Sequence, residues 1–302
     1  MGVQSVGMTP IRVALTCDDA PTIYSRPGGI EPDPARLDRV RQGLREHGVR
    51  HCVAFVVGRS VLGQREPLVR WLEAGYELGN HTFQHLAASG VNPAEFLADV
   101  ARCDQLLASI GAFAAGRPRL FRFPYLDRGP SPQARLALTA EVKAMGYTIV
   151  SGTVDFYDHL YEEPLARALA QGQQRQAQMV EARYLETACR SVAYRARWIR
   201  RTPGPELTHI ALFHAGLISP AVLPRLLDRM ARQEVVWSSL TQALAHPFYR
   251  RAEEDLAQTG LIDYQYRSRT LAERVKRKLV EYSCRLNWMQ QDRFGPCWPY
   301  LA

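Results

Sequence analysis

The sequence predicts an α/β fold in which parallel strands alternate with helices. About seven short runs are rich in β-branched and aromatic residues, and each is bounded by Gly, Pro or Asp. Helical patterns of greater length lie between these runs. Such an alternation is typical of successive βα units, which assemble into either a barrel or an open parallel sheet.

Each element has its own local signal. The strand-like runs cover 11–17, 51–57, 76–80, 119–124, 147–154, 209–214 and 234–240. The helical patterns between them cover 33–48, 64–75, 93–110, 131–145 and 220–232. In the first helix we expect Asp33 as N-cap, Pro34 at the first position and Gly48 as the stop, and in the third we expect Asn92 as N-cap.

Two segments depart from the alternation and define the expected domains. Residues 160–203 form one long helical stretch, longer than a βα unit requires, and the strands end after residue 246. We therefore expect an α/β domain over 1–249 with a helical insertion at about 160–203, followed by a helical basic extension over 250–302.

Composition excludes several classes of protein. The chain has 302 residues, 46% of them hydrophobic, and no run approaches the ~20 apolar residues of a spanning helix. The six cysteines are scattered, and the first residues lack the pattern of a secretory signal, so we expect a cytoplasmic protein. The net charge of +8 includes a basic run at 267–285. This run favours at most weak contact with a membrane surface, and we expect no nucleic-acid partner.

Carboxylates and histidines follow several of the predicted strands. Asp18 and Asp19 end the first strand, and two adjacent carboxylates need a cation or a proton nearby. His81 and His85 follow the third strand, and their spacing places both imidazoles on one face of a helical turn. With Asp19 they predict a site for a Lewis-acidic divalent metal, made of two histidines and one carboxylate.

Polar residues also follow the later strands. Arg122, after the fourth strand, is available to hold Asp18 in its ionised state. Asp155 and Asp158 follow the fifth strand, and His214 ends the sixth. Beside a carboxylate such as Asp158, His214 is a candidate general acid.

Five segments, in this order, resemble the motifs of the NodB-homology polysaccharide deacetylases, carbohydrate esterase family 4. They are TCDDAP (16–21), GNHTFQH (79–85), FRFPYL (121–126), VDFYDH (154–159) and IALFHAG (210–216). The resemblance spans about residues 11–246. It implies a distorted (β/α)7 barrel of the NodB type, with a long helical insertion before the last motif and a helical C-terminal tail.

The resemblance also implies a role for each matching residue. The metal ligands would be Asp19, His81 and His85, with zinc expected from the ligand types and cobalt, nickel, manganese or iron as alternatives. Asp18, braced by Arg122, would be the general base. The backbone N–H of Tyr125 would hold the oxyanion. His214 would protonate the leaving amine, and Asp158, or alternatively Asp155, would tune it.

The implied activity is the metal-dependent removal of an N-acyl group, acetyl above all, from an amino sugar or a sugar-containing metabolite. Two alternatives remain open: the same chemistry on a formamido sugar or a cyclic amide, and a catalytically inactive binding barrel. Four residues depart from the family pattern: Cys17, Ala20, His159 and Ala215. His159 stands where many members have a Trp that walls one side of the sugar groove, so we expect the hydrolytic residues to be retained and the sugar groove to differ from that of an ordinary polysaccharide deacetylase.

Overall fold

The structure is a computed structural model that describes residues 10–23, 29–114, 116–199 and 206–259. The chain divides into one compact unit over Met1–Gly260 and a second over Leu261–Ala302. The predicted basic run at 267–285 lies outside the described residues. Among the helices that are described, none is long and apolar enough to cross a membrane.

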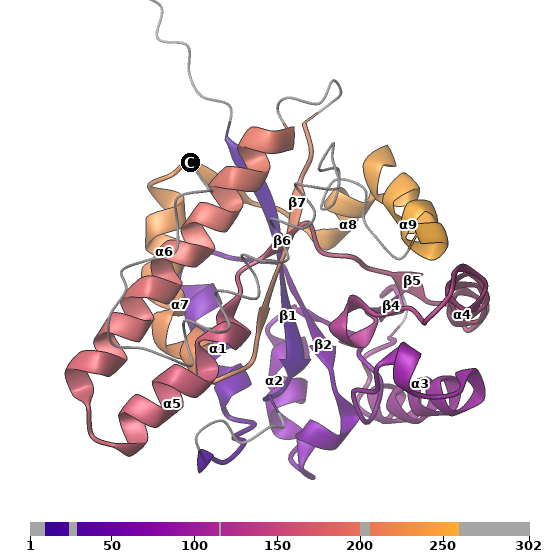
Figure 1. Ribbon diagram of the computed structural model, residues 1–302, viewed down its shortest axis with the longest axis horizontal. Helices are drawn as coiled ribbons and strands as arrows, with labels where there is room; N and C mark the ends of the chain where they lie inside the picture. The colour runs from indigo at the N-terminus through magenta and orange to yellow at the C-terminus, as the bar shows by residue number, and fades with distance from the viewer. Residues whose placement is uncertain (1–9, 24–28, 115, 200–205, 260–302) are drawn as a thin grey trace, which may run out of the picture. The chain divides into compact units, whose positions relative to one another are not determined.

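The first unit is built on a curved parallel sheet surrounded by helices (Figure 1). Its hydrogen-bonded order is β5-β4-β3-β2-β1-β7-β6, and β8 also pairs with β1. Every strand pairing is parallel. The strands are β1 (Ile11–Ala20), β2 (Cys52–Val56), β3 (Glu77–Asn80), β4 (Leu120–Phe121), β5 (Thr148–Ile149), β6 (Val154–Asp155), β7 (His209–His214) and β8 (Val235–Trp237).

The run predicted as one strand over 147–154 is split into β5 and β6, and this split closes the barrel. The two strands lie at opposite ends of the hydrogen-bonded order, but only four residues separate them. The N–H of Val150 donates to the carbonyl of Phe121 on β4, and that of Thr153 donates to Ile210 on β7, each at 2.8 Å. One segment therefore joins both edges of the sheet, and the predicted distorted (β/α)7 barrel is confirmed.

The helices follow the predicted order, with changes at their ends. They are α1 (Arg36–Glu46), α2 (Glu66–Glu73), α3 (Pro93–Ser109), α4 (Pro132–Ala144), α5 (Glu162–Ala170), α6 (Gln174–Ile199), α7 (Ile218–Ala231), α8 (Leu240–Leu244) and α9 (Pro247–Thr259). Asn92 caps α3 as expected, because its side chain accepts from the N–H of Glu95. The N-cap of α1 is Ala35 instead of Asp33. Asp33 still accepts from the N–H of Ala35 at 2.9 Å, so it supports the turn just before the helix.

The predicted helical stretch at 160–203 is two helices instead of one. Gly172 has a φ of +65°, a left-handed conformation that ends α5 before α6 begins. Helix α6 packs on α7 and on β6, and its apolar face is buried. In Figure 1, α5 and α6 lie on the same side of the strands as α7. The insertion is thus part of the helical layer around the barrel; residues 200–205 lie outside the described part.

Helix α9 packs on the barrel, although the expected domain boundary at 249/250 falls inside it. The hydroxyl of Tyr249 donates to the carbonyl of Thr208 at 2.7 Å. The carboxylate of Glu253 accepts from Ser151 and from Arg128, each at 2.7 Å. Because Ser151 lies in the segment that closes the barrel, α9 belongs to the first unit, and the contacts divide the chain after Gly260.

Candidate functional site

The C-terminal end of β1 directs two adjacent carboxylates to different partners. Asp18 is buried, whereas Asp19 has a φ of 55°, and its side chain is 16% exposed. Cys17, which directly precedes them in the sequence, is fully buried. Burial raises the pKa of the Cys17 thiol well above its ordinary value. Cys17 is not among the side chains that converge on Asp19.

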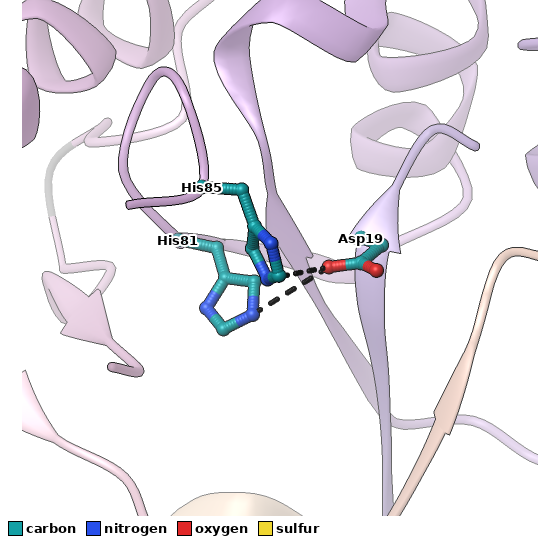
Figure 2. A group of neighbouring side chains, drawn as sticks. All are labelled: Asp19, His81 and His85. Carbon is teal, nitrogen blue, oxygen red and sulfur yellow. Dashed lines mark ion pairs between the residues drawn. The ribbon is translucent and has the colours of Figure 1, made fainter. Parts of the chain in front are cut away.

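Asp19, His81 and His85 converge as the sequence predicts (Figure 2). Oδ1 of Asp19 lies 3.1 Å from Nε2 of His85 and 3.7 Å from Nε2 of His81. The same oxygen is buried and has no hydrogen-bond partner. A buried carboxylate oxygen aimed at two imidazole nitrogens is the arrangement that a divalent cation would satisfy.

Both imidazoles are neutral, and His81 presents an unprotonated Nε2 to the group. Nδ1 of His81 lies 2.7 Å from the carbonyl of Arg122. Since a carbonyl only accepts, Nδ1 carries the proton and Nε2 presents a lone pair. Burial, followed by the neighbouring His85, lowers the pKa of His81 to about 3. Burial likewise lowers the pKa of His85. Both rings are therefore neutral near pH 7, as metal ligands must be.

The histidines converge through a loop, so the expected helical turn at 81–85 is wrong. Thr82 and His85 adopt left-handed backbone, with φ of 64° and 58°. The side chain of Asn80 fixes this path, because its oxygen accepts from the N–H of Thr82 at 2.8 Å and its amide donates to Tyr147 Oη at 2.9 Å. The N–H of Gln84 also donates to Asp99. Hydrogen bonds from the side chains of Asn80 and Asp99 to this loop, and not helical periodicity, bring the rings together.

Arg122 braces Asp18 as predicted. Its Nη1 donates to Oδ1 of Asp18 at 2.5 Å and to Oγ1 of Thr16 at 2.8 Å, and its Nε donates to the carbonyl of Val150 at 3.2 Å. The guanidinium also lies over the ring of Phe55, 4.2 Å from its centroid. Arg122 is fully buried, so this charge needs its carboxylate partner. Thr16 is a contact that strand patterning alone does not reveal.

Tyr125 lies beside the metal-ligand group in the turn after β4. Its φ is 57°, and its side chain is 69% exposed. Its ring centroid is 4.4 Å from that of His85. The oxyanion-binding role of its backbone N–H stays a prediction.

His214, at the end of β7, forms a second charged pair with Asp158. In the β1–β7 pairing His214 lies opposite Asp18, so it faces the same end of the barrel. Nδ1 of His214 lies 2.7 Å from Oδ1 of Asp158, which is fully buried. Burial opposes a charge on His214, but the Asp158 carboxylate outweighs it and raises the pKa of His214 well above its ordinary value.

The structure shows which of the two candidate carboxylates, Asp155 or Asp158, contacts His214. Asp155 directs its Oδ1 to the N–H of Tyr157 at 2.7 Å, so Asp158 is the carboxylate that contacts the imidazole. Oδ2 of Asp158 accepts from the N–H of His214 at 2.5 Å and from Ser219 Oγ at 2.6 Å. Ser219 lies in the first turn of α7, and no spacing in the sequence pointed to it. The exposed His159 lies near this pair, with its ring centroid 5.6 Å from that of His214.

Comparison with known protein families confirms the resemblance. Residues 6–150 match the family model described as polysaccharide deacetylase. The peptidoglycan-N-acetylmuramic acid deacetylase PdaC of Bacillus subtilis is 29% identical over 113 residues, which are 37% of this chain and 21% of that protein. A peptidoglycan-N-acetylglucosamine deacetylase of Bacillus cereus is 27% identical over 146 residues, which are 48% of this chain and 46% of the relative. The matches thus span less than half of the length of each relative.

Solved structures share the fold. A deacetylase determined with its substrate has a TM-score of 0.52 at 20% identity, over 78% of this chain and 92% of the other. A pseudoenzyme mutant of carbohydrate esterase family 4 with restored activity has a TM-score of 0.51 at 19% identity, over 78% of this chain and 68% of the other. PdaC itself has a TM-score of 0.50 at 19% identity, over 83% of this chain and 98% of the other. These likenesses concern the fold.

Proposed function

Starting from its confirmed likeness to the NodB-homology polysaccharide deacetylases, we propose that this chain is a metal-dependent deacetylase that hydrolyses the N-acetyl group of an amino sugar. One observation carries the proposal: Asp19, His81 and His85 converge on one point, with the Asp18–Arg122 pair and the Asp158–His214 pair at the same end of the barrel. A ligand group, a candidate base and a candidate acid are thereby present together.

The donor set fits a divalent cation. Two neutral imidazole nitrogens and one carboxylate oxygen are the ligands of catalytic zinc sites, which leave a position for water and substrate. The unpartnered Oδ1 of Asp19 supports this fit. We propose zinc as the native ion, with cobalt, nickel, manganese and iron as the alternatives that such ligands also bind. When bound, the ion supplies a Lewis acid that polarises the acyl carbonyl and makes water more acidic.

Side chains of this protein would then accept and donate the protons of the reaction. Asp18, held in place by Arg122, accepts the proton of the attacking water. The backbone N–H of Tyr125 donates to the developing oxyanion, and one such donor is worth about 3 kcal/mol in related chemistry. His214 has its Nδ1 engaged with Asp158, so its Nε2 proton is the one that passes to the leaving nitrogen.

Two observations support the proposed class of substrate: the names of the relatives, and one residue that departs from the family pattern. The curated relatives are named for deacetylation of peptidoglycan amino sugars, which supports an N-acetylated amino sugar as the substrate class. An exposed imidazole at His159 replaces the flat indole of the family pattern. A smaller and more polar residue at this position supports a short oligosaccharide or a sugar-containing metabolite over a long polymer.

Acetate release tests the proposal. Zinc-loaded protein is incubated with N-acetylglucosamine oligomers and with peptidoglycan fragments, and matched N-formyl sugars and a cyclic amide run in parallel. We expect acetate from an N-acetyl substrate with the wild type and none above background with Asp18→Asn. Asp33→Asn, which alters a carboxylate beside α1, is the control and should retain activity. If no substrate is cleaved although the ion is bound, the inactive binding barrel replaces the enzyme.

A further inference from the structure

The turn between β7 and α7 follows directly on His214, the last residue of β7, and contacts the start of the inserted segment. Two carboxylates four residues apart in the sequence, Asp158 just before the insertion and Glu162 within it, accept hydrogen bonds from the end of β7 and from this turn. Asp158 binds the backbone N–H and the ring of His214. Glu162, at the start of α5, binds two residues further along the turn.

Glu162 is closely fitted to its partners. Its Oε2 accepts from the N–H of Leu217 at 2.7 Å, and its Oε1 accepts from the N–H of Ile218 at 3.1 Å. The side chain is only 5% exposed. A Cβ on Gly216 would lie 2.2 Å from Oε1 of Glu162, so glycine is the residue that permits this approach. The carboxylate therefore occupies the N-terminus of α7, where backbone N–H groups and the helix dipole favour an anion.

We propose that Glu162 is a positioning residue that fixes the place of His214 at the reacting group. This inference rests on the proposed function, since it assigns Glu162 a part in delivering the proton from His214. The role belongs to the helical insertion, which thereby controls the geometry of the candidate acid although it lies outside the strands that carry the other site residues.

Glu162 acts on His214 through the backbone of the β7–α7 turn. The N–H of Ala215 donates to the carbonyl of Asp18 at 3.0 Å, so the start of the turn is tied to β1. Glu162 accepts hydrogen bonds from the end of the turn, at Leu217 and Ile218. Without Glu162, two N–H groups of the turn lose their acceptor, and the turn moves to find water or another partner. Since a shift of about 1 Å in a reacting group can lower a rate about 100-fold, a small movement of His214 has a large effect.

The test compares three single variants. Glu162→Gln keeps the shape but replaces one acceptor with an amide donor, and Glu162→Ala removes both acceptors. Glu163→Gln is the matched control, because Glu163 is the next residue on α5 and its side chain is 52% exposed beside Arg167. We expect kcat to fall about 10-fold or more for Glu162→Gln and further for Glu162→Ala, with KM unchanged. Glu163→Gln should match the wild type in both constants.

Two further readouts separate positioning from mere stability. The imidazole nitrogen resonances of His214, assigned with His214→Gln, should shift in Glu162→Gln and not in Glu163→Gln. In a double-mutant cycle, Gly216→Ala should lower kcat in the wild type but much less in the Glu162→Ala background, because the obstructing oxygen is then absent. If Glu162→Ala fails to fold, Glu162→Gln carries the test through its kcat and its His214 resonances, because its amide keeps the shape of the carboxylate.

The outcomes distinguish this inference from the proposed function. If the wild type deacetylates a sugar but the Glu162 variants keep its kcat and its His214 resonances, even with a lower melting temperature, the positioning role is wrong. If the wild type cleaves no substrate, the proposed function fails. The His214 resonances still decide then whether Glu162 fixes the imidazole, because NMR needs no turnover.

Discussion

Removing Arg122 should destabilise the protein more than any exposed charge does. The perturbation is Arg122→Met, which keeps much of the volume and removes the charge. The guanidinium is completely buried and donates to Asp18, Thr16 and Val150. Asp18, whose side chain is 5% exposed, would be left as a buried carboxylate without its cation. Breaking a buried ion pair in this way costs about 3–5 kcal/mol.

Urea unfolding followed by circular dichroism measures this cost. With a denaturant slope of about 2 kcal/mol/M, a loss of about 4 kcal/mol lowers the midpoint by about 2 M. Arg167→Met is the control, because Arg167 and Glu163 have side chains 62% and 52% exposed and such pairs contribute at most about 1 kcal/mol. The double variant Asp18→Asn/Arg122→Met should be more stable than Arg122→Met alone, since no unpaired charge remains.

Two results would refute this reasoning. One is an Arg122→Met protein within about 1 kcal/mol of the wild type, the range of a surface pair. The other is a double variant no more stable than the single one, which would mean that the lost hydrogen bonds and packing, and not the abandoned carboxylate, set the cost.

Three further predictions concern other parts of the site. Gly79→Ala should lower the free energy of unfolding by about 1–3 kcal/mol, because its Cβ would lie 2.5 Å from the ring of Phe55. Gly90→Ala is the control and should change the free energy of unfolding little, because the nearest atom to its Cβ would be 3.9 Å away. Equal effects of the two substitutions would contradict the close contact between Gly79 and Phe55. His214→Gln should lower kcat about 10²- to 10⁴-fold with zinc content unchanged, and an unchanged kcat would remove His214 from the reaction. The raised pKa of His214 also predicts a pH dependence of stability. The folded state then holds a proton that the unfolded state loses above about pH 6.5. The stabilisation is thus complete below that pH and lost as pH rises through the raised pKa, by at most ~1.4 kcal/mol per pH unit. Urea unfolding of wild type and His214→Gln at several pH values should show curves that approach each other above pH 6.5; parallel curves would contradict the assignment.

The sequence predicts the alternation of strands and helices because each element has a local cause. Apolar runs such as 11–17 and caps such as Asn92 act over a few residues, and the structure bears them out. The closure of the barrel depends instead on Val150 and Thr153 finding partners on β4 and β7. No periodicity within 147–154 encodes those partners, so one expected strand became two.

In the candidate site, too, some features can be predicted from the sequence and others depend on tertiary contacts. The types of residue that follow the strands predict the metal-ligand group, the Asp18–Arg122 pair and the Asp158–His214 pair, and the structure brings each together. The path of the loop at 81–85 escapes prediction, because Asn80 and Asp99 hold it through tertiary hydrogen bonds. Glu162 escapes it too, since a glutamate at the start of a helix is ordinary until its partners in α7 are known.

Binding of zinc to the metal-free protein tests the central claim most directly. Isothermal titration calorimetry at pH 7 should give one zinc ion per chain for the wild type and for Asp33→Asn, whose carboxylate lies beside α1 and outside the ligand group. Asp19→Asn and His85→Gln should bind at least 10-fold more weakly. Absence of binding by the wild type, or equal binding by all four proteins, would contradict the claim that Asp19, His81 and His85 form one metal site.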